Sequence, residues 1–200
     1  MGHRFADIAF TDRVKALQKV QGSRTAYSRL EGGEVHHNRL GVAEAAFLAE
    51  RDSFYMATVS ETGWPYVQHR GGPPGFIKVL DERTLGFADF RGNQQFVSVG
   101  NLVGDDRVAL ILVDYPRRRR LKILGHARVV TVHDDPDLVR RFELDTYPAK
   151  IERALVITVD AFDWNCPQHI TPRFTEAEIA AAVAPLRARI AELEAELARR

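Results

Sequence analysis

The feature that most constrains the fold is a series of short β-prone runs, separated by turn residues, in the middle of the chain. Runs joined by a tight turn pair as antiparallel hairpins. The run 107–115 is almost continuously apolar, which predicts a central strand buried on both faces. The sequence therefore predicts a mainly β (β+α) fold, an antiparallel barrel of six or seven strands. The expected strands are residues 54–59, 65–69, 76–80, 84–88, 107–115, 121–131 and 154–159.

Helical patterns precede and interrupt these runs. Thr11 is a suitable N-cap for a helix that ends at Gly22, and residues 41–51 are rich in helix formers with one apolar face. Shorter helices are expected at 96–102 and after Asp134. The sequence thus predicts helices packed around the barrel.

The C-terminal segment 175–200 predicts an amphipathic helix, which begins with a capping box formed by Thr175 and Glu178. Its apolar residues alternate at spacings of four and three, as in a coiled coil, and they are Ile179, Val183, Leu186, Ile190, Leu193 and Leu197. Pro185 interrupts the pattern, which weakens an isolated coil. We expect this stripe to pack on the barrel or across a dimer rather than to bind a foreign helix.

Two polar, glycine-containing loops combine features of an anion site. In residues 69–76, three glycines permit close backbone approach and two prolines stiffen the loop. In residues 89–94, Arg91, Asn93 and Gln94 supply a guanidinium fork and amide donors of the kind that hold a phosphate. Either loop alone could be a tight turn with solvated charges. Together they favour a site for a phosphorylated cofactor.

Three separated motifs carry a family resemblance. The stretches 70–76, 89–93 and 100–102, in this order, resemble the pyridoxamine 5'-phosphate oxidase-like, FMN-binding split-barrel proteins, over about residues 38–174. The resemblance implies an antiparallel split β-barrel with peripheral helices and a C-terminal helix. It also implies a homodimer that binds FMN at the subunit interface. The run that grips the pyridoxal ring in true pyridoxamine phosphate oxidases is missing, so the chain is not expected to be one.

The same resemblance implies a set of cofactor-binding residues. Arg70 and Lys78 resemble the cationic pair near the flavin, and Asn93 and Gln94 stand where similar proteins have an Arg-Lys pair for the phosphate. Arg91 is expected to restore the lost charge. The full expected set is Arg70, Gly71, Gly72, Lys78, Asp89, Arg91, Asn93, Gln94, Asn101, Arg120, Lys122, Trp164 and Gln168.

A second unusual stretch, residues 163–170, combines aromatic, thiol, amide and imidazole groups. We expect it to follow the final strand and to bring Trp164 against the flavin, with Cys166 and Gln168 as its neighbours. The alternative is an indole that fills a gap in the core. No catalytic residue is assigned, because unpaired histidines such as His69 and His169 are more often structural.

Composition excludes several partner classes. A net charge of +1 over 200 residues gives no long-range field for nucleic acid or an anionic membrane, and the arginines at 117–120 are expected to form a solvated hairpin end. No apolar run is long enough to span a membrane, and one cysteine cannot form an internal disulfide, so a cytoplasmic protein is expected. The adjacent histidines at 36 and 37 point apart on regular structure, so no metal site is expected.

The expected organisation is an N-terminal helical extension (1–40), the FMN-binding split-barrel domain (41–174) and the C-terminal helix (175–200). The expected function is an FMN-dependent oxidoreductase that acts on an unidentified small molecule. The alternative is a noncatalytic flavin- or haem-binding module of the same fold, because the flavin itself carries the redox chemistry and no catalytic side chain is required.

Overall fold

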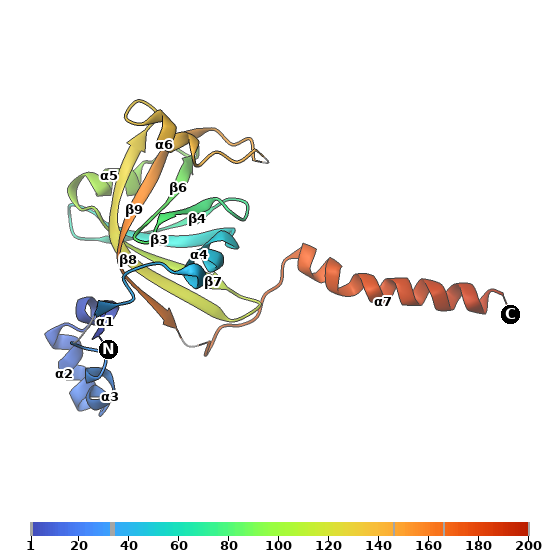
Figure 1. Cartoon of the computed structure of the whole chain (residues 1–200), viewed down its shortest axis with the longest axis horizontal. Coiled ribbons are helices and arrows are strands. Elements are labelled where there is room, and N and C mark those ends of the chain that lie inside the picture. Colours follow the sequence, from blue (N-terminus) through green and yellow to red (C-terminus); the bar gives the residue numbers. More distant parts are fainter. Residues whose placement is uncertain (1, 33–34, 146, 166, 200) are drawn as a thin grey trace. The chain divides into compact units, whose positions relative to one another are not determined.

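The computed structural model describes residues 2–32, 35–145, 147–165 and 167–199, and its largest element is a seven-stranded sheet (Figure 1). The strand order is β4-β3-β7-β8-β9-β6-β5, and neighbouring strands run antiparallel. The strands are β3 (Ser53–Val59), β4 (Pro65–Gly71), β5 (Ile77–Asp81), β6 (Thr84–Phe90), β7 (Arg107–Asp114), β8 (Arg119–Thr131) and β9 (Ile151–Asn165). The predicted mainly β fold, with its six or seven antiparallel strands, is confirmed.

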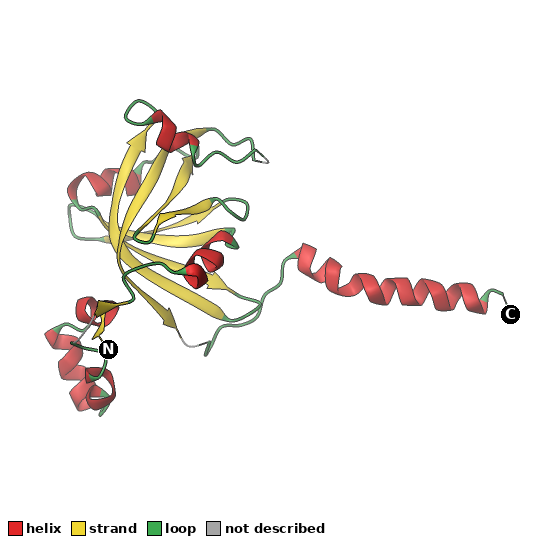
Figure 2. Ribbon diagram, in the orientation of Figure 1, coloured by secondary structure: helices red, strands yellow, loops and turns green. Residues whose placement is uncertain are grey.

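Seven helices and a short parallel pair of strands complete the described chain (Figure 2). Thr11 caps α2, accepting from the Val14 N–H at 3.4 Å, and Thr175 with Glu178 forms the capping box of α7, as predicted. The helices are α1 (Arg4–Ala9), α2 (Asp12–Val20), α3 (Arg24–Ser28), α4 (Val42–Ala49), α5 (Val97–Gly104), α6 (Pro136–Arg140) and α7 (Glu176–Leu197), and the pair is β1 (Gly2–His3) with β2 (Val35–His36).

The chain divides into two compact units. The first comprises residues 1–113 and 120–166 and contains the sheet, and the second comprises residues 114–119 and 167–200 and contains α7. The core of the first unit is built from the inward faces of the strands. Phe54 stacks on Phe76 and meets Phe87 edge-on, with ring centroids 5.9 and 5.0 Å apart, so aromatic contacts hold together β3, β6 and the residue that precedes β5.

The strand β7 differs from its prediction. Its residues alternate between buried and partly exposed, with Val108, Leu110 and Leu112 buried and Ala109 and Ile111 on the other face. The expectation of burial on both faces is therefore wrong for the single chain. The sheet covers only one of the two apolar faces of this strand.

The final strand is also longer than predicted. It continues through Asn165, because the ladder with β8 extends to the pairs Leu121↔Trp164 and Arg120↔Asn165. Trp164 is thus part of β9 and does not belong to an arm that follows the last strand. Its indole N–H donates to Glu44 Oε1 at 2.8 Å, and its ring meets Phe47 edge-on with centroids 4.8 Å apart.

The register of β8 and β9 shifts at Leu124 and Gly125, and the two backbones approach closely at this point. A Cβ atom on Gly125 would lie 2.2 Å from the carbonyl oxygen of Thr158, which is a backbone atom that cannot move aside alone. The irregularity in the longest ladder of the sheet therefore requires glycine at this position.

We predict that Gly125→Ala lowers the free energy of unfolding by roughly 1–3 kcal/mol, because the added methyl group must push two paired strands apart. Urea unfolding followed by circular dichroism measures this change. The matched control is Gly100→Ala in α5, where an added Cβ meets no atom within 4 Å. We expect the control to be neutral or slightly stabilising, because alanine is the better helix former. Equal stability of Gly125→Ala and wild type would contradict the close approach.

Candidate functional site

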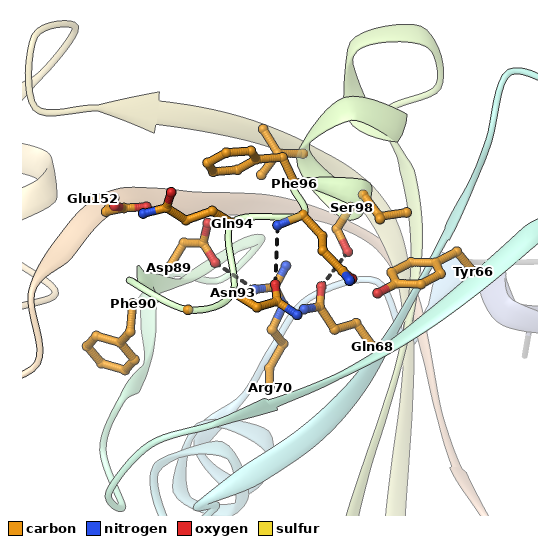
Figure 3. Close-up of a pocket in the computed structure, with 14 residues that line it drawn as sticks. Tyr66, Gln68, Arg70, Asp89, Phe90, Asn93, Gln94, Phe96, Ser98 and Glu152 are labelled. Atoms are coloured by element: carbon orange, nitrogen blue, oxygen red, sulfur yellow. Dashed lines mark hydrogen bonds and ion pairs between the residues drawn. The ribbon is translucent and has the colours of Figure 1, made fainter.

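A small polar cavity lies where β4, the loop after β6 and the start of α5 meet (Figure 3). Its volume is about 60 Å³, room for a few water-sized groups. The lining residues are Tyr66, Gln68, Arg70, Asp89, Phe90, Gly92, Asn93, Gln94, Gln95, Phe96, Val97, Ser98, Val99 and Glu152.

The wall that β4 supplies follows from strand geometry. Tyr66, Gln68 and Arg70 occupy alternate positions and are partly buried, whereas Val67 and His69 between them are exposed. Alternate residues of a strand point to the same side, so these three side chains face the cavity together. Gln68 is held by the Ser98 hydroxyl, which donates to its Oε1 at 2.8 Å.

A cluster of buried charges lies at the cavity, and two of its members, Arg70 and Asp89, line the cavity. Arg70 Nη1 donates to Asp89 Oδ1 at 2.6 Å, and Arg153 Nε lies 3.4 Å from Asp89 Oδ2. The three side chains are only 13, 12 and 15 % exposed. Four strands separate β4 from β6 in the sheet order, so the Arg70–Asp89 pair joins distant strands through side chains. The predicted convergence of the two polar loops is confirmed at this pair.

Several donors around the cavity have no partner. In the part of the chain that the structure describes, Arg70 Nε and Arg153 Nε are buried without a hydrogen bond. No side chain among the described residues caps the N terminus of α5, and the residues of its first turn line the cavity. Buried donors are nearly always satisfied in native proteins, and free helix N termini favour anions. The cavity therefore offers guanidinium and backbone N–H donors to an anion.

The loop from Arg91 to Gln95 closes the other side. Asn93 Oδ1 accepts from the Gln95 N–H at 3.2 Å, and Gln94 has a φ of 60°, a conformation that non-glycine residues rarely adopt. Arg91 is 56 % exposed and lies 3.8 Å from Glu152. Its charge is therefore near the rim, while Asn93 and Gln94 line the cavity itself.

The structure brings four of the expected cofactor-binding residues into this cavity, Arg70, Asp89, Asn93 and Gln94. Gly71 ends β4 and Gly72 follows it, and Gly72 packs so closely on Phe76 that a Cβ would lie 2.7 Å from its ring. Asn101, on α5, donates to Thr58 Oγ1 at 2.9 Å and so attaches the helix to β3.

Other expected residues lie elsewhere in the first unit. Lys78 Nζ donates to the carbonyl oxygens of Arg141 and Glu143 at 2.6 and 3.3 Å. These bonds satisfy backbone carbonyl groups that follow the last residue of α6. Lys122 lies 3.5 Å from Asp163 and 5.0 Å above the ring of Phe5.

Arg120, Lys122 and Trp164 share one end of the β8–β9 ladder. Glu152, at the cavity, is twelve positions from Trp164 along β9, which corresponds to about 40 Å of extended strand. Gln168 belongs to the second unit, and Cys166 lies outside the described residues.

Among the cavity residues, sequence reasoning missed Tyr66, Gln68, Ser98 and Glu152. The first two could have been found from Arg70, because the period of two along a strand places them on its side. The others reach the cavity only through tertiary packing and left no local signal.

The paired histidines at 36 and 37 lie at the end of β2 and directly after it. Among the described residues, no group of three His, Cys, Asp or Glu side chains could hold a metal ion. His37 instead stacks on His3 with centroids 4.1 Å apart, and burial together with the His37 charge lowers the pKa of His3. No described helix is both long and apolar enough to cross a membrane.

Comparison with solved structures places the fold among known proteins. HupZ from Group A Streptococcus is 15% identical, with a TM-score of 0.50 over 68% of this chain and 100% of that chain. A protein related to general stress protein 26 from Clostridium acetobutylicum, of the pyridoxinephosphate oxidase family, is 14% identical, with a TM-score of 0.46 over 69% and 95%. An FMN-binding protein from Syntrophomonas wolfei is 12% identical, with a TM-score of 0.44 over 77% and 97%. At these identities the likeness to HupZ concerns the fold alone.

Curated protein sequences include no match to this chain. The sequence profile described as pyridoxamine 5'-phosphate oxidase matches residues 42–163, which is more than half of the chain and contains every strand of the sheet except the last two residues of β9. This match supports a flavin-binding, oxidoreductase-like function in general terms. The chain therefore belongs to the pyridoxamine 5'-phosphate oxidase family.

Proposed function

We propose that this protein is an FMN-dependent oxidoreductase acting on a small molecule, and that the cavity beside Arg70 holds the phosphate of FMN. The observation that carries the proposal is the buried guanidinium Nε of Arg70, a cavity residue, which lacks a hydrogen-bond partner within the described chain. A phosphate offers several acceptor oxygens in the geometry that guanidinium groups match.

The charges and the helix support the same ligand. Among the described residues, Arg70, Arg91 and Arg153 pair with two carboxylates, Asp89 and Glu152, so this group carries one excess positive charge. The uncapped N terminus of α5 adds backbone N–H donors and the positive end of its dipole. Membership of the pyridoxamine 5'-phosphate oxidase family supports a flavin as the molecule that carries this phosphate.

The cavity is large enough for only one part of the cofactor. About 60 Å³ accommodates a phosphate group but not a three-ring isoalloxazine. The rings must then lie outside the cavity, where the bound flavin supplies the redox chemistry while the chain orients it and limits its contact with water. We assign no catalytic side chain.

A second copy of the chain supplies the cover for the rings in this proposal. Arg120, Lys122 and Trp164 lie at the end of the β8–β9 ladder that is far from the cavity. A flavin whose phosphate occupies the cavity can therefore contact these three residues only if they come from a second copy of the chain. The uncovered face of β7 supports such a homodimer. It belongs to a mainly apolar groove of about 200 Å³. The groove residues on four adjacent strands are Tyr55, Ala57, Val67, Ala109, Leu110, Ile111, Lys122 and Leu124.

The phosphate assignment predicts that Arg70→Gln weakens FMN binding about ten- to a hundredfold, because one charge-assisted hydrogen bond is worth roughly 1.5–3 kcal/mol. Riboflavin has no phosphate, and its affinity should stay the same. Titration of both flavins, followed by flavin fluorescence, measures the two dissociation constants.

The matched control is Arg140→Gln, which removes a 65 % exposed guanidinium on α6 and should leave both affinities unchanged. Thermal unfolding shows whether Arg70→Gln keeps the fold, since Arg153 still neutralises Asp89. A folded Arg70→Gln protein that binds FMN as tightly as wild type would overturn the assignment.

The dimer proposal predicts a mass of about 45 kDa, twice the 22.5 kDa chain, by light scattering. We expect Ile111→Glu to lower FMN affinity, because it would bury a carboxylate in the contact between the copies and separate the two halves of each site. The control is Val103→Glu, an identical change of charge at an 88 % exposed position on α5. Unchanged FMN affinity of Ile111→Glu, or a wild-type monomer that binds FMN, contradicts the shared site.

A further inference from the structure

The helix α7 presents an apolar stripe to solvent along its whole length. The helix has 22 residues, all of them described, and none is buried. Ile179, Leu186, Ile190, Leu193 and Leu197 are 53, 64, 55, 42 and 69 % exposed. Single exposed apolar residues are common, but five on one stripe of one helix indicate a contact surface.

The spacing of the stripe defines a heptad register. The steps alternate between four and three residues, so Val183, Ile190 and Leu197 take position a and Ile179, Leu186 and Leu193 take position d. Two consecutive a/d pairs, Val183 with Leu186 and Ile190 with Leu193, have a β-branched residue at a and leucine at d. In a parallel coiled coil, this combination favours two helices over three or four.

The charges beside the seam also select the orientation. Arg189 takes position g and Glu194 takes position e, five residues later, so a parallel pair of helices places each arginine beside the glutamate of the other copy. An antiparallel pair with all six layers aligned would instead place Arg187 near Arg187 and Arg189 near Arg189 of the other copy. The like charges disfavour that arrangement.

From this register and these charges we propose that α7 pairs in parallel with α7 of a second copy, as a short two-stranded coiled coil. The second copy is the occupant that the stripe fits, because the pattern is complementary to itself. This contact lies outside residues 42–163 and does not depend on the flavin site.

Pro185 does not prevent the pairing. It takes position c, on the outer side of the helix, so its ring stays out of the seam. It removes one backbone hydrogen bond, which makes the coil weak in isolation. Four continuous layers, from Leu186 to Leu197, follow it. A weak coil of this kind forms when another contact between the copies raises the local concentration of the helices.

Position-specific disulfide formation tests the pairing in the full-length chain. The single Cys166 is first replaced by serine, and Leu193→Cys is then introduced at position d, where parallel helices bring the two thiols together. Mild oxidation should give a covalent dimer of about 45 kDa, twice the chain mass, on a non-reducing gel. The control Ala188→Cys lies at the outer position f and should remain at 22.5 kDa.

Charge reversal provides the second measurement. Arg189→Glu alone places like charges beside the seam and should slow crosslinking of Leu193→Cys several-fold, and Glu194→Arg alone should do the same. The two changes together exchange the charges and should restore the rate. Equal crosslinking of the Leu193→Cys and Ala188→Cys proteins, or no covalent dimer with Leu193→Cys, would overturn the proposal. Crosslinking between Val183→Cys and Leu193→Cys copies but not between two Leu193→Cys copies would show an antiparallel pair and overturn it too.

Discussion

The buried contact of Arg70 and Arg153 with Asp89 is the interaction on which the rest of the site depends. It joins β4 to β6 and β9 through side chains, where no backbone ladder connects β4 to the other two. A buried carboxylate is costly unless it is paired, and two guanidinium groups from separate strands satisfy this one. The same pairing leaves the Nε of Arg70 without a hydrogen-bond partner and fixes this guanidinium group at the cavity. The same contact thus closes this side of the barrel and positions a guanidinium group for an anion.

This arrangement explains how a nearly neutral chain can favour an anion. The net charge of +1 gives no general attraction, but the cavity combines fixed guanidinium groups, an amide-rich loop and a free helix N terminus within a small volume. Such donors are already oriented before the ligand arrives, so little conformational entropy is lost on binding. The small size of the cavity then restricts the anion to a single phosphate-sized group and leaves the bulk of a cofactor on the surface.

Much of this structure could be predicted from the sequence, and the errors have identifiable causes. The hairpins were predictable, because alternation and turn residues are local signals. The contact of Lys78 with the flavin stays a prediction, and in this structure its Nζ donates to carbonyl groups after α6, a tertiary contact without a sequence pattern. The last strand was predicted too short because polar residues precede Cys166. The partner strand β8 decides how far the ladder extends. The outer face of β7 was expected to be buried because the whole run is apolar. An apolar sequence does not show which molecule covers that face.

The absorption spectrum of the 200-residue chain with FMN tests most directly whether the protein is a flavin-dependent oxidoreductase. We expect flavin bands that remain with the protein through gel filtration, bleach when NADH or NADPH is added without oxygen, and return in air. A protein that does not retain FMN, or one whose bound FMN neither nicotinamide nucleotide reduces, would contradict that function.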